Sequence, residues 1–428
     1  MPTRRSLLAG GTAAALTAPL TVSAASPAAA EGRSRHRRLT TGADVAAARR
    51  WSILRGRKVG VISNPTGVLS DASHIVDSMA ARDELDIVGV FGPEHGFRGS
   101  AQAGESEDTF TDPRTGLTVY DAYGADTAKM RELFTTSGAD TVVFDIQDVG
   151  VRFYTYVWTM YRAMAAARDI GARFVVLDRP NPIGRWADGP LMTPDYTSGV
   201  GLKEIIQQHG MTVGELARYF NGELLPHEGD GGRVELEVVE CRGWDPYSTA
   251  ADSPLPFVPP SPNMPTADTA AVYAGTGFFE GTNISEGRGL TRPFEMVGAP
   301  YLDYRWSDRL NALDLPGVRF REAYFVPTFS KHEGKTCAGV QVFVSDPKRF
   351  RPLPTAVAML VEAHRYPDFA WREDSWDPER PFWIDKLSGS PRLREMIDAG
   401  ADADECVDAW RGEVHDFERA RRRYLLYR

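Results

Sequence analysis

Short apolar segments alternate with segments of helical periodicity over residues 57–178, and this alternation constrains the fold more than any other feature of the sequence. The apolar segments are of strand length: 58–63, 87–92, 117–124, 141–147 and 173–178. The segments with helical spacing lie between them: 74–82, 126–138 and 156–171. Strands that alternate with helices form βαβ units, so we expect a Rossmann-like α/β domain with a mainly parallel sheet.

Polar side chains follow these predicted strands at the point where each strand ends. Four strand ends carry them: Asn64; Glu94 and His95; Asp145, Gln147 and Asp148, with Arg152 and Tyr154 just beyond; and Asp178, Arg179 and Asn181. Because the carboxyl ends of parallel strands meet at one edge of a sheet, these residues predict a ligand site there. The phosphate-binding patterns GxGxxG and GxxxxGK[ST] are absent from the sequence, which argues against a nucleotide ligand.

The chain changes character after about residue 250. Residues 254–266 are so rich in proline that they cannot form a helix or a strand, which predicts a rigid segment between domains or a wall of the cleft. The remainder shows mixed helical and strand patterns. We therefore expect a Rossmann-like domain over residues 40–250 and a second α/β (α+β) domain over residues 251–428, with the active-site cleft between them.

The N-terminus has the pattern of an export signal over residues 1–30. Arg4 and Arg5 precede an apolar run that is too short to cross a bilayer and that ends in small residues up to Ala30. A twin arginine followed by Ser-Leu-Leu resembles a twin-arginine (Tat) signal. The sequence thus predicts an exported protein that is extracellular or associated with the cell wall. No later apolar run is long enough to span a membrane.

Charge and cysteine content exclude several classes of partner. The formal net charge of −9 argues against binding to a nucleic-acid backbone. The 3 cysteines are widely spaced and form no disulfide framework. The CxxC, HExxH and EF-hand patterns do not occur in the sequence, so we expect neither a metal nor a cofactor.

The segment FGPEHGFRGS (residues 91–100) places a glutamate and a histidine between proline and glycine, with Arg98 four residues after Glu94. A carboxyl group among apolar neighbours keeps its proton more readily, so Glu94 is a candidate general acid. His95 is its candidate partner, or the acid itself. The alternative is a structural role in which the Glu94 carboxylate accepts hydrogen bonds from backbone N–H groups in a tight loop.

Two further segments carry candidate site residues. Asp145, Gln147 and Asp148 are suited to binding sugar hydroxyls, with a helix cap or a salt bridge to Arg152 as the alternative. A glycine-rich segment contains Glu280, Asn283, Glu286, Arg288 and Arg292, which could supply a nucleophile, a base, a hydroxyl acceptor or cations for a carboxylate. The alternative for the second segment is a solvated charged loop.

Several motifs together resemble the exo-β-N-acetylmuramidase (NamZ, YbbC-like) family. They are GVISNPTGV, FGPEHGFRG, FDIQDVGVRFYTYVWTM, VLDRPNPIG, PPSPNMPT, GTGFFEGTNISEGRG, RPFE and FSKHEGKTCAGVQ, in this order over about residues 40–428. The resemblance implies a Rossmann-like domain followed by a C-terminal domain, with the site between them. It implies an exo-acting glycoside hydrolase that releases N-acetylmuramic acid from the non-reducing end of peptidoglycan fragments such as MurNAc-GlcNAc.

The resemblance also implies which residues act. By motif match Glu94 is the catalytic glutamate, and Asn263 of PPSPNMPT joins the candidate substrate-binding residues. The second catalytic group stays open between Glu280, Glu286, Asp145, Asp148 and the 2-acetamido oxygen of the substrate. Two other functional classes also stay open: an extracellular hydrolase of an ester or phosphate bond, and a cell-wall-binding protein without catalytic activity.

Overall fold

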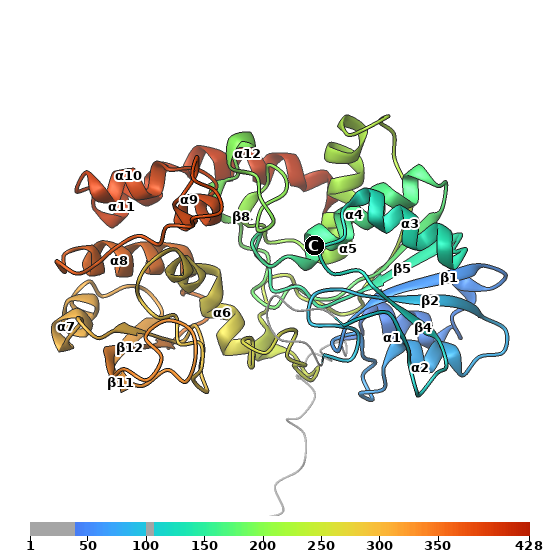
Figure 1. Ribbon diagram of the computed structural model, residues 1–428, viewed down its shortest axis with the longest axis horizontal. Helices are drawn as coiled ribbons and strands as arrows, with labels where there is room; N and C mark the ends of the chain where they lie inside the picture. The colour runs from blue at the N-terminus through green and yellow to red at the C-terminus, as the bar shows by residue number, and fades with distance from the viewer. Residues whose placement is uncertain (1–38, 100–106) are drawn as a thin grey trace, which may run out of the picture. The chain divides into compact units, whose positions relative to one another are not determined.

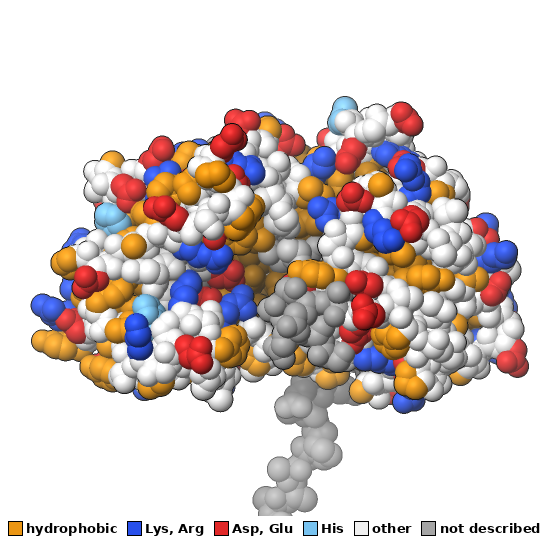
Figure 2. Space-filling view, in the orientation of Figure 1, with side chains coloured by type: hydrophobic (Ala, Val, Ile, Leu, Met, Phe, Trp, Pro, Cys, Tyr) orange, Lys and Arg blue, Asp and Glu red, His pale blue; other side chains and the backbone are white. Residues whose placement is uncertain are grey.

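The computed structural model describes residues 39–99 and 107–428, and residues 38–428 belong to one compact unit. The predicted export signal of residues 1–30 lies outside the described residues. No helix in the described part of the chain combines the length and the apolar character needed to cross a membrane. Acidic and basic side chains are interspersed over the face of the molecule seen in Figure 2.

A seven-stranded sheet forms the core of the first half of the chain (Figure 1). Its strands are β1 (Lys58–Ser63), β2 (Asp86–Gly92), β3 (Phe110–Thr111), β4 (Thr118–Asp121), β5 (Thr141–Asp145), β6 (Arg173–Leu177) and β9 (Glu235–Val239). The strand order is β3-β4-β2-β1-β5-β6-β9, and every neighbouring pair is parallel except β3 with β4. Without the short β3, this is the strand order of a Rossmann fold, which confirms the predicted fold class.

Helices cover both faces of this sheet (Figure 1). One face carries α1 (Gly42–Ala48) and α2 (Ile75–Ala80), and the other carries α3 (Thr127–Ser137), α4 (Tyr156–Asp169) and α5 (Val213–Tyr219). Successive residues of β5 point to opposite faces, so Val143 packs with the first group and Phe144 with the second. A sheet buried on both faces needs strands that are apolar throughout, which is the pattern that identified them in the sequence.

The second half of the chain contains a small antiparallel sheet and a set of helices. The sheet consists of β10 (Met296–Ala299), β12 (Cys337–Val344) and β11 (Val318–Phe325), in that order. The helices are α6 (Ala267–Thr276), α7 (Tyr304–Ala312), α8 (Pro352–His364), α9 (Trp383–Ser388), α10 (Arg392–Asp398), α11 (Ala403–Asp408) and α12 (Arg411–Arg421). A two-stranded sheet of β7 (Asp188–Leu191) and β8 (Ile206–Gln208) completes the strands that the structure describes.

The C-terminal residues return to the first sheet. Arg421, at the end of α12, donates hydrogen bonds to the carbonyl oxygens of His209 and Gly210 at 2.7 and 2.6 Å. The Tyr427 hydroxyl donates to Asp178, directly after β6, at 2.5 Å. The end of the chain therefore fastens the C-terminal helices to the edge of the sheet at which the strands end.

Candidate active site

A pocket of about 160 Å³ is lined by residues from both halves of the chain. The first half contributes Glu94, His95, Phe153, Tyr154, Thr155, Tyr156 and Val200. The second half contributes Ser261, Asn263, Met264, Tyr273, Glu280, Arg288 and Phe294. It lies where the loops after β2 and β5 leave the carboxyl edge of the sheet, on either side of β1. This is the position at which a Rossmann sheet reverses its strand order and binds ligands.

The loop after β2 presents Glu94 through a turn that needs its glycine. His95 and Gly96 have positive φ angles of 70° and 77°, and the Gly96 N–H donates to the Pro93 carbonyl oxygen at 2.9 Å. A Cβ atom on Gly96 would lie 2.3 Å from the carboxyl carbon of Glu107. Glu107 in turn accepts a hydrogen bond from the Phe97 N–H at 3.1 Å. The Pro-Glu-His-Gly sequence thus forms a tight, strained turn that carries Glu94 to the pocket wall.

Glu94 is held from the start of helix α4. The Thr155 hydroxyl donates to Glu94 Oε2 at 3.0 Å, and the Tyr156 hydroxyl lies 3.3 Å from the Glu94 carbonyl oxygen. Thr155 is the N-cap residue of α4, but its side chain does not cap the helix. The residue at the start of this helix therefore holds the Glu94 carboxyl group at the pocket wall.

Four charged side chains contact one another in a row that begins at Glu280, the second carboxyl group in the pocket lining. Arg288 Nη2 donates to Glu280 Oε1 at 3.0 Å, and Arg288 Nε donates to Glu286 Oε1 at 3.1 Å. The other oxygen of Glu286 accepts from Lys331 Nζ at 2.9 Å. Glu280 and Arg288 line the pocket, whereas both oxygens of Glu286 are already bound.

The environments of these two glutamates move their pKa values in opposite directions. Burial raises the pKa of Glu280, and the nearby Glu286 charge adds to this effect, although Arg288 and Lys331 oppose it. Burial also acts to raise the pKa of Glu286, but the charges of Lys331 and Arg288 outweigh it and hold that pKa below its usual value. Glu280 is thus the carboxyl group of the pair that can exchange a proton.

Aromatic residues shape the rest of the pocket. The ring of Tyr154 meets those of Tyr156 and Tyr273 edge to face, at 5.3 and 5.9 Å between centroids. The Tyr156 hydroxyl lies 2.8 Å from the carbonyl oxygen of Pro260, which fixes the proline-rich segment as a wall of the pocket. Burial raises the hydroxyl pKa of all three tyrosines, so they stay neutral hydrogen-bonding groups.

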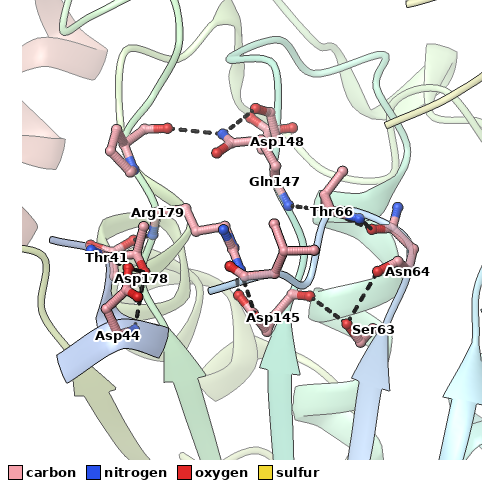
Figure 3. A network of polar contacts seen from close by, with 12 residues as sticks. Thr41, Asp44, Ser63, Asn64, Thr66, Asp145, Gln147, Asp148, Asp178 and Arg179 are labelled. Atoms are coloured by element: carbon pink, nitrogen blue, oxygen red, sulfur yellow. Dashed lines mark hydrogen bonds and ion pairs between the residues drawn. The ribbon is translucent and has the colours of Figure 1, made fainter. Parts of the chain in front are cut away.

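Asp145, a candidate for the second catalytic group, is placed in a buried ion pair instead (Figure 3). Arg179 donates to its two oxygens at 2.5 and 2.7 Å, and both side chains are almost fully buried. The neighbouring candidates also bind within the protein. Asn64 accepts hydrogen bonds from Thr66, and Gln147 donates to the carbonyl oxygens of Asp148 and Pro180.

The remaining acidic candidate at this sheet edge is not part of the pocket lining. Asp148 Oδ2 accepts from the Gly150 N–H at 2.7 Å and lies 3.1 Å from His209 Nε2, and His209 is fully buried. His209 Nδ1 accepts from the Met211 N–H, so Nε2 carries the hydrogen that binds Asp148. These contacts replace the salt bridge to Arg152 that the sequence suggested.

Three candidate arginines have structural partners. Arg152 is fully buried, donates to the carbonyl oxygens of Pro190, Ile205 and Leu387, and is not part of the pocket lining. Arg98 binds the carboxylates of Asp77 and Asp112, and Arg292 binds that of Glu295. Asn283, between the two glutamates, binds the Tyr301 hydroxyl and the Asp368 carbonyl oxygen.

The structure therefore brings together Glu94, His95, Tyr154, Asn263, Glu280 and Arg288 around one pocket, with Glu286 directly behind it. Thr155 and Tyr273 were not among the candidates that the sequence provided. The signal for Thr155 was its place beyond the end of β5, at the same sheet edge as Glu94. Tyr273 lies on helix α6 and gave no such signal.

No group of three or more His, Cys, Asp or Glu side chains in the described ranges lies close enough together to hold a metal ion. Cys241, Cys337 and Cys406 are buried and unpaired.

Known proteins resemble the chain along nearly its whole length. It is 40% identical over 428 residues to the peptidoglycan beta-N-acetylmuramidase NamZ of Bacillus subtilis (strain 168), covering 99% of this chain and 100% of that protein. Two crystal structures of DUF1343 family proteins from Bacteroides fragilis NCTC 9343 have TM-scores of 0.80 and 0.71 to it, at 32% and 30% identity. Each covers 91% of this chain and 99% of its own.

Both halves of the chain match models of one family. Residues 59–268 match the model described as exo-beta-N-acetylmuramidase NamZ, N-terminal, and residues 271–427 match the model described as exo-beta-N-acetylmuramidase NamZ, C-terminal. These two ranges meet at the start of helix α6, within the pocket-forming part of the chain. The chain belongs to the exo-β-N-acetylmuramidase NamZ family.

Proposed function

We propose that this protein is an exo-acting glycoside hydrolase that releases N-acetylmuramic acid from the non-reducing end of peptidoglycan fragments such as MurNAc-GlcNAc. The observation that carries the proposal is the pocket in which Glu94 from one half of the chain and Glu280 from the other are both part of the lining. Two carboxyl groups at one site are what most glycosidases use to cleave a glycosidic bond.

Glu94 acts as the general acid in this proposal. Its side chain donates a proton to the oxygen of the leaving sugar, and the Thr155 hydroxyl holds it in place for this transfer. Glu280 is the second carboxyl group, because it lines the pocket, whereas Asp145, Asp148 and Glu286 do not. In its ionised form it attacks the anomeric carbon or activates a water molecule, and the anomer released first distinguishes the two routes.

Arg288 is the candidate for reading the lactyl carboxylate that distinguishes N-acetylmuramic acid from N-acetylglucosamine. Its Nε and Nη2 atoms bind the two glutamates, whereas its Nη1 atom has no hydrogen-bond partner among the described residues. An arginine can bind a carboxylate through such a remaining donor even when its other donors are occupied.

A panel of chromogenic substrates tests the function. We expect hydrolysis of the N-acetylmuramide, much slower hydrolysis of the N-acetylglucosaminide, and none of the ester or phosphate. Release of N-acetylmuramic acid from defined MurNAc-GlcNAc, followed by chromatography, tests the exo action. Preferred hydrolysis of the ester or phosphate would favour a different hydrolase, and binding without any turnover would favour a wall-binding protein.

We also propose that the protein is exported through the twin-arginine route. The support is the Arg4-Arg5 pair ahead of a short apolar run. Replacement of both arginines by lysine should leave the protein inside the cell, as measured by immunoblotting of cell and medium fractions. Unchanged secretion of this variant would contradict the proposed route and would leave the proposed activity untouched.

A further inference from the structure

Lys331 lies outside the pocket lining but binds the segment that carries Glu280 and Glu286. Its ammonium group donates to the Phe279 carbonyl oxygen at 2.7 Å, to the Ile284 carbonyl oxygen at 3.1 Å and to Glu286 Oε2 at 2.9 Å. An ammonium group has three hydrogens, so these three oxygens use all of them. Phe279 directly precedes Glu280, and one side chain therefore anchors the segment on both sides of that residue.

The same side chain begins a row of alternating charges that ends in the pocket. Lys331 contacts Glu286, Glu286 contacts Arg288, and Arg288 contacts Glu280. Because Lys331 binds one oxygen of Glu286, Arg288 does not have to neutralise that carboxylate alone. Its guanidinium group can then divide its donors between Glu286 and Glu280.

We propose that Lys331 is a positioning residue that keeps Glu280 in place and ionised, by neutralising Glu286 and so leaving Arg288 available to Glu280. This inference rests on the proposed function, in which the ionised form of Glu280 takes part in catalysis. Without Lys331, one positive charge near the Glu280 carboxylate is removed. Arg288 is then shared between Glu280 and a Glu286 carboxylate that has no lysine to neutralise it. The proton then binds Glu280 at a higher pH, in agreement with the opposing effects of Lys331 and Glu286 on its pKa.

The other titratable groups around Glu280 are neutral, are paired with other residues or line the pocket. Tyr273 of α6 stays neutral because burial raises its pKa. Helix α9, which packs against the short helix Gly277–Gly281, carries Asp385 and Lys386, and these are bound by Arg394 and Asp377 respectively. Glu94 and His95 line the same pocket from the other half of the chain. The row from Lys331 to Arg288 thus supplies the positive charge in direct contact with the two glutamates.

The acidic limb of the pH profile of kcat/KM on the chromogenic muramide tests the inference, because a purely structural role would not move it. We expect Lys331→Met to shift this limb upward by on the order of one pH unit. We expect Glu286→Gln to shift it downward, since this change removes a negative charge and leaves Arg288 to Glu280. Lys331→Arg should restore most of the wild-type profile. The matched control is Lys335→Met, an exposed lysine on the same segment, which should leave the limb in place.

Opposite shifts in the Lys331→Met and Glu286→Gln variants would support the inference. An unchanged limb in a folded Lys331→Met variant, or shifts of the same sign in both, would overturn it. If Lys331→Met does not fold, the direction of the Glu286→Gln shift decides alone, and an upward or absent shift would overturn the inference. A wild-type protein that does not hydrolyse the muramide would instead contradict the proposed function, so the two failures are distinguishable.

Discussion

The Thr155 hydroxyl donates a hydrogen bond to Glu94 Oε2 at 3.0 Å, although Thr155 occupies the N-cap position of helix α4. A threonine at this position ordinarily accepts a hydrogen bond from a backbone N–H of the first helical turn, which stabilises the helix by about 1 kcal/mol. Here the hydroxyl points to the carboxyl group of the turn after β2. The loops after two different strands, 61 residues apart, are thereby joined at the pocket.

Removal of this hydroxyl should impair catalysis more than folding. We expect Thr155→Val to lower kcat several-fold to about tenfold, because the hydroxyl positions the acid and a hydrogen bond contributes about 0.5–1.5 kcal/mol. The melting temperature should change little, since the helix gains no cap from the wild-type side chain. Thr155→Ser keeps the hydroxyl and should retain most of the activity. An active Thr155→Val variant together with an impaired Thr155→Ser variant would indicate that the methyl group, not the hydrogen bond, is what matters.

Substitution of Arg288 should change selectivity between substrates. Arg288→Lys keeps a positive charge near Glu280 and Glu286 but lacks the remaining Nη1 donor. We expect the ratio of kcat/KM for the muramide to that for the glucosaminide to fall by roughly tenfold, the effect of one charged hydrogen bond. A loss of the same size for both substrates would show instead that Arg288 acts through the two glutamates alone.

Asp145 should matter for stability and not for substrate binding. Asp145→Asn leaves the buried Arg179 guanidinium without its partner charge, which should lower the free energy of unfolding by about 3–5 kcal/mol. The KM of the folded variant should stay near that of the wild type. The control is Asp416→Asn, which breaks an ion pair on the exposed surface of α12 and should cost less than about 1 kcal/mol. Urea unfolding measures both, and a raised KM with unchanged stability would return Asp145 to the substrate site.

The first sheet could be predicted from the sequence because its central strands β1, β5 and β6 are buried on both faces. Apolar segments such as 58–63 and 141–147 then differ from their surroundings over their whole length. The C-terminal half was harder, because its short helices depend on packing. Two of these helices, α11 and α12, end and begin on either side of Ala409 and Trp410.

The candidate site could be predicted only in part, because polar residues at a sheet edge look alike in a sequence. Glu94 lies just after β2 and Asp145 is the last residue of β5, but the two differ in which distant residues contact them. Asp145 is neutralised by Arg179, which lies 34 residues further along the chain. Arg152 binds the Leu387 carbonyl oxygen, 235 residues away. Such distant partners have no signature in local spacing, so the sequence identified the edge of the sheet but not which of its side chains line the pocket.

Substitution of Glu94 by glutamine tests most directly whether Glu94 is the general acid of an N-acetylmuramidase. Glu94→Gln keeps the shape and the Thr155 contact but removes the transferable proton. We expect kcat on the chromogenic N-acetylmuramide to fall by about 100- to 10,000-fold, with an unchanged melting temperature. Glu132→Gln, at an exposed position on α3, is the matched control and should be as active as the wild type. A folded Glu94→Gln protein with kcat within about threefold of the wild type would contradict the account, since loss of a general acid is expected to cost far more.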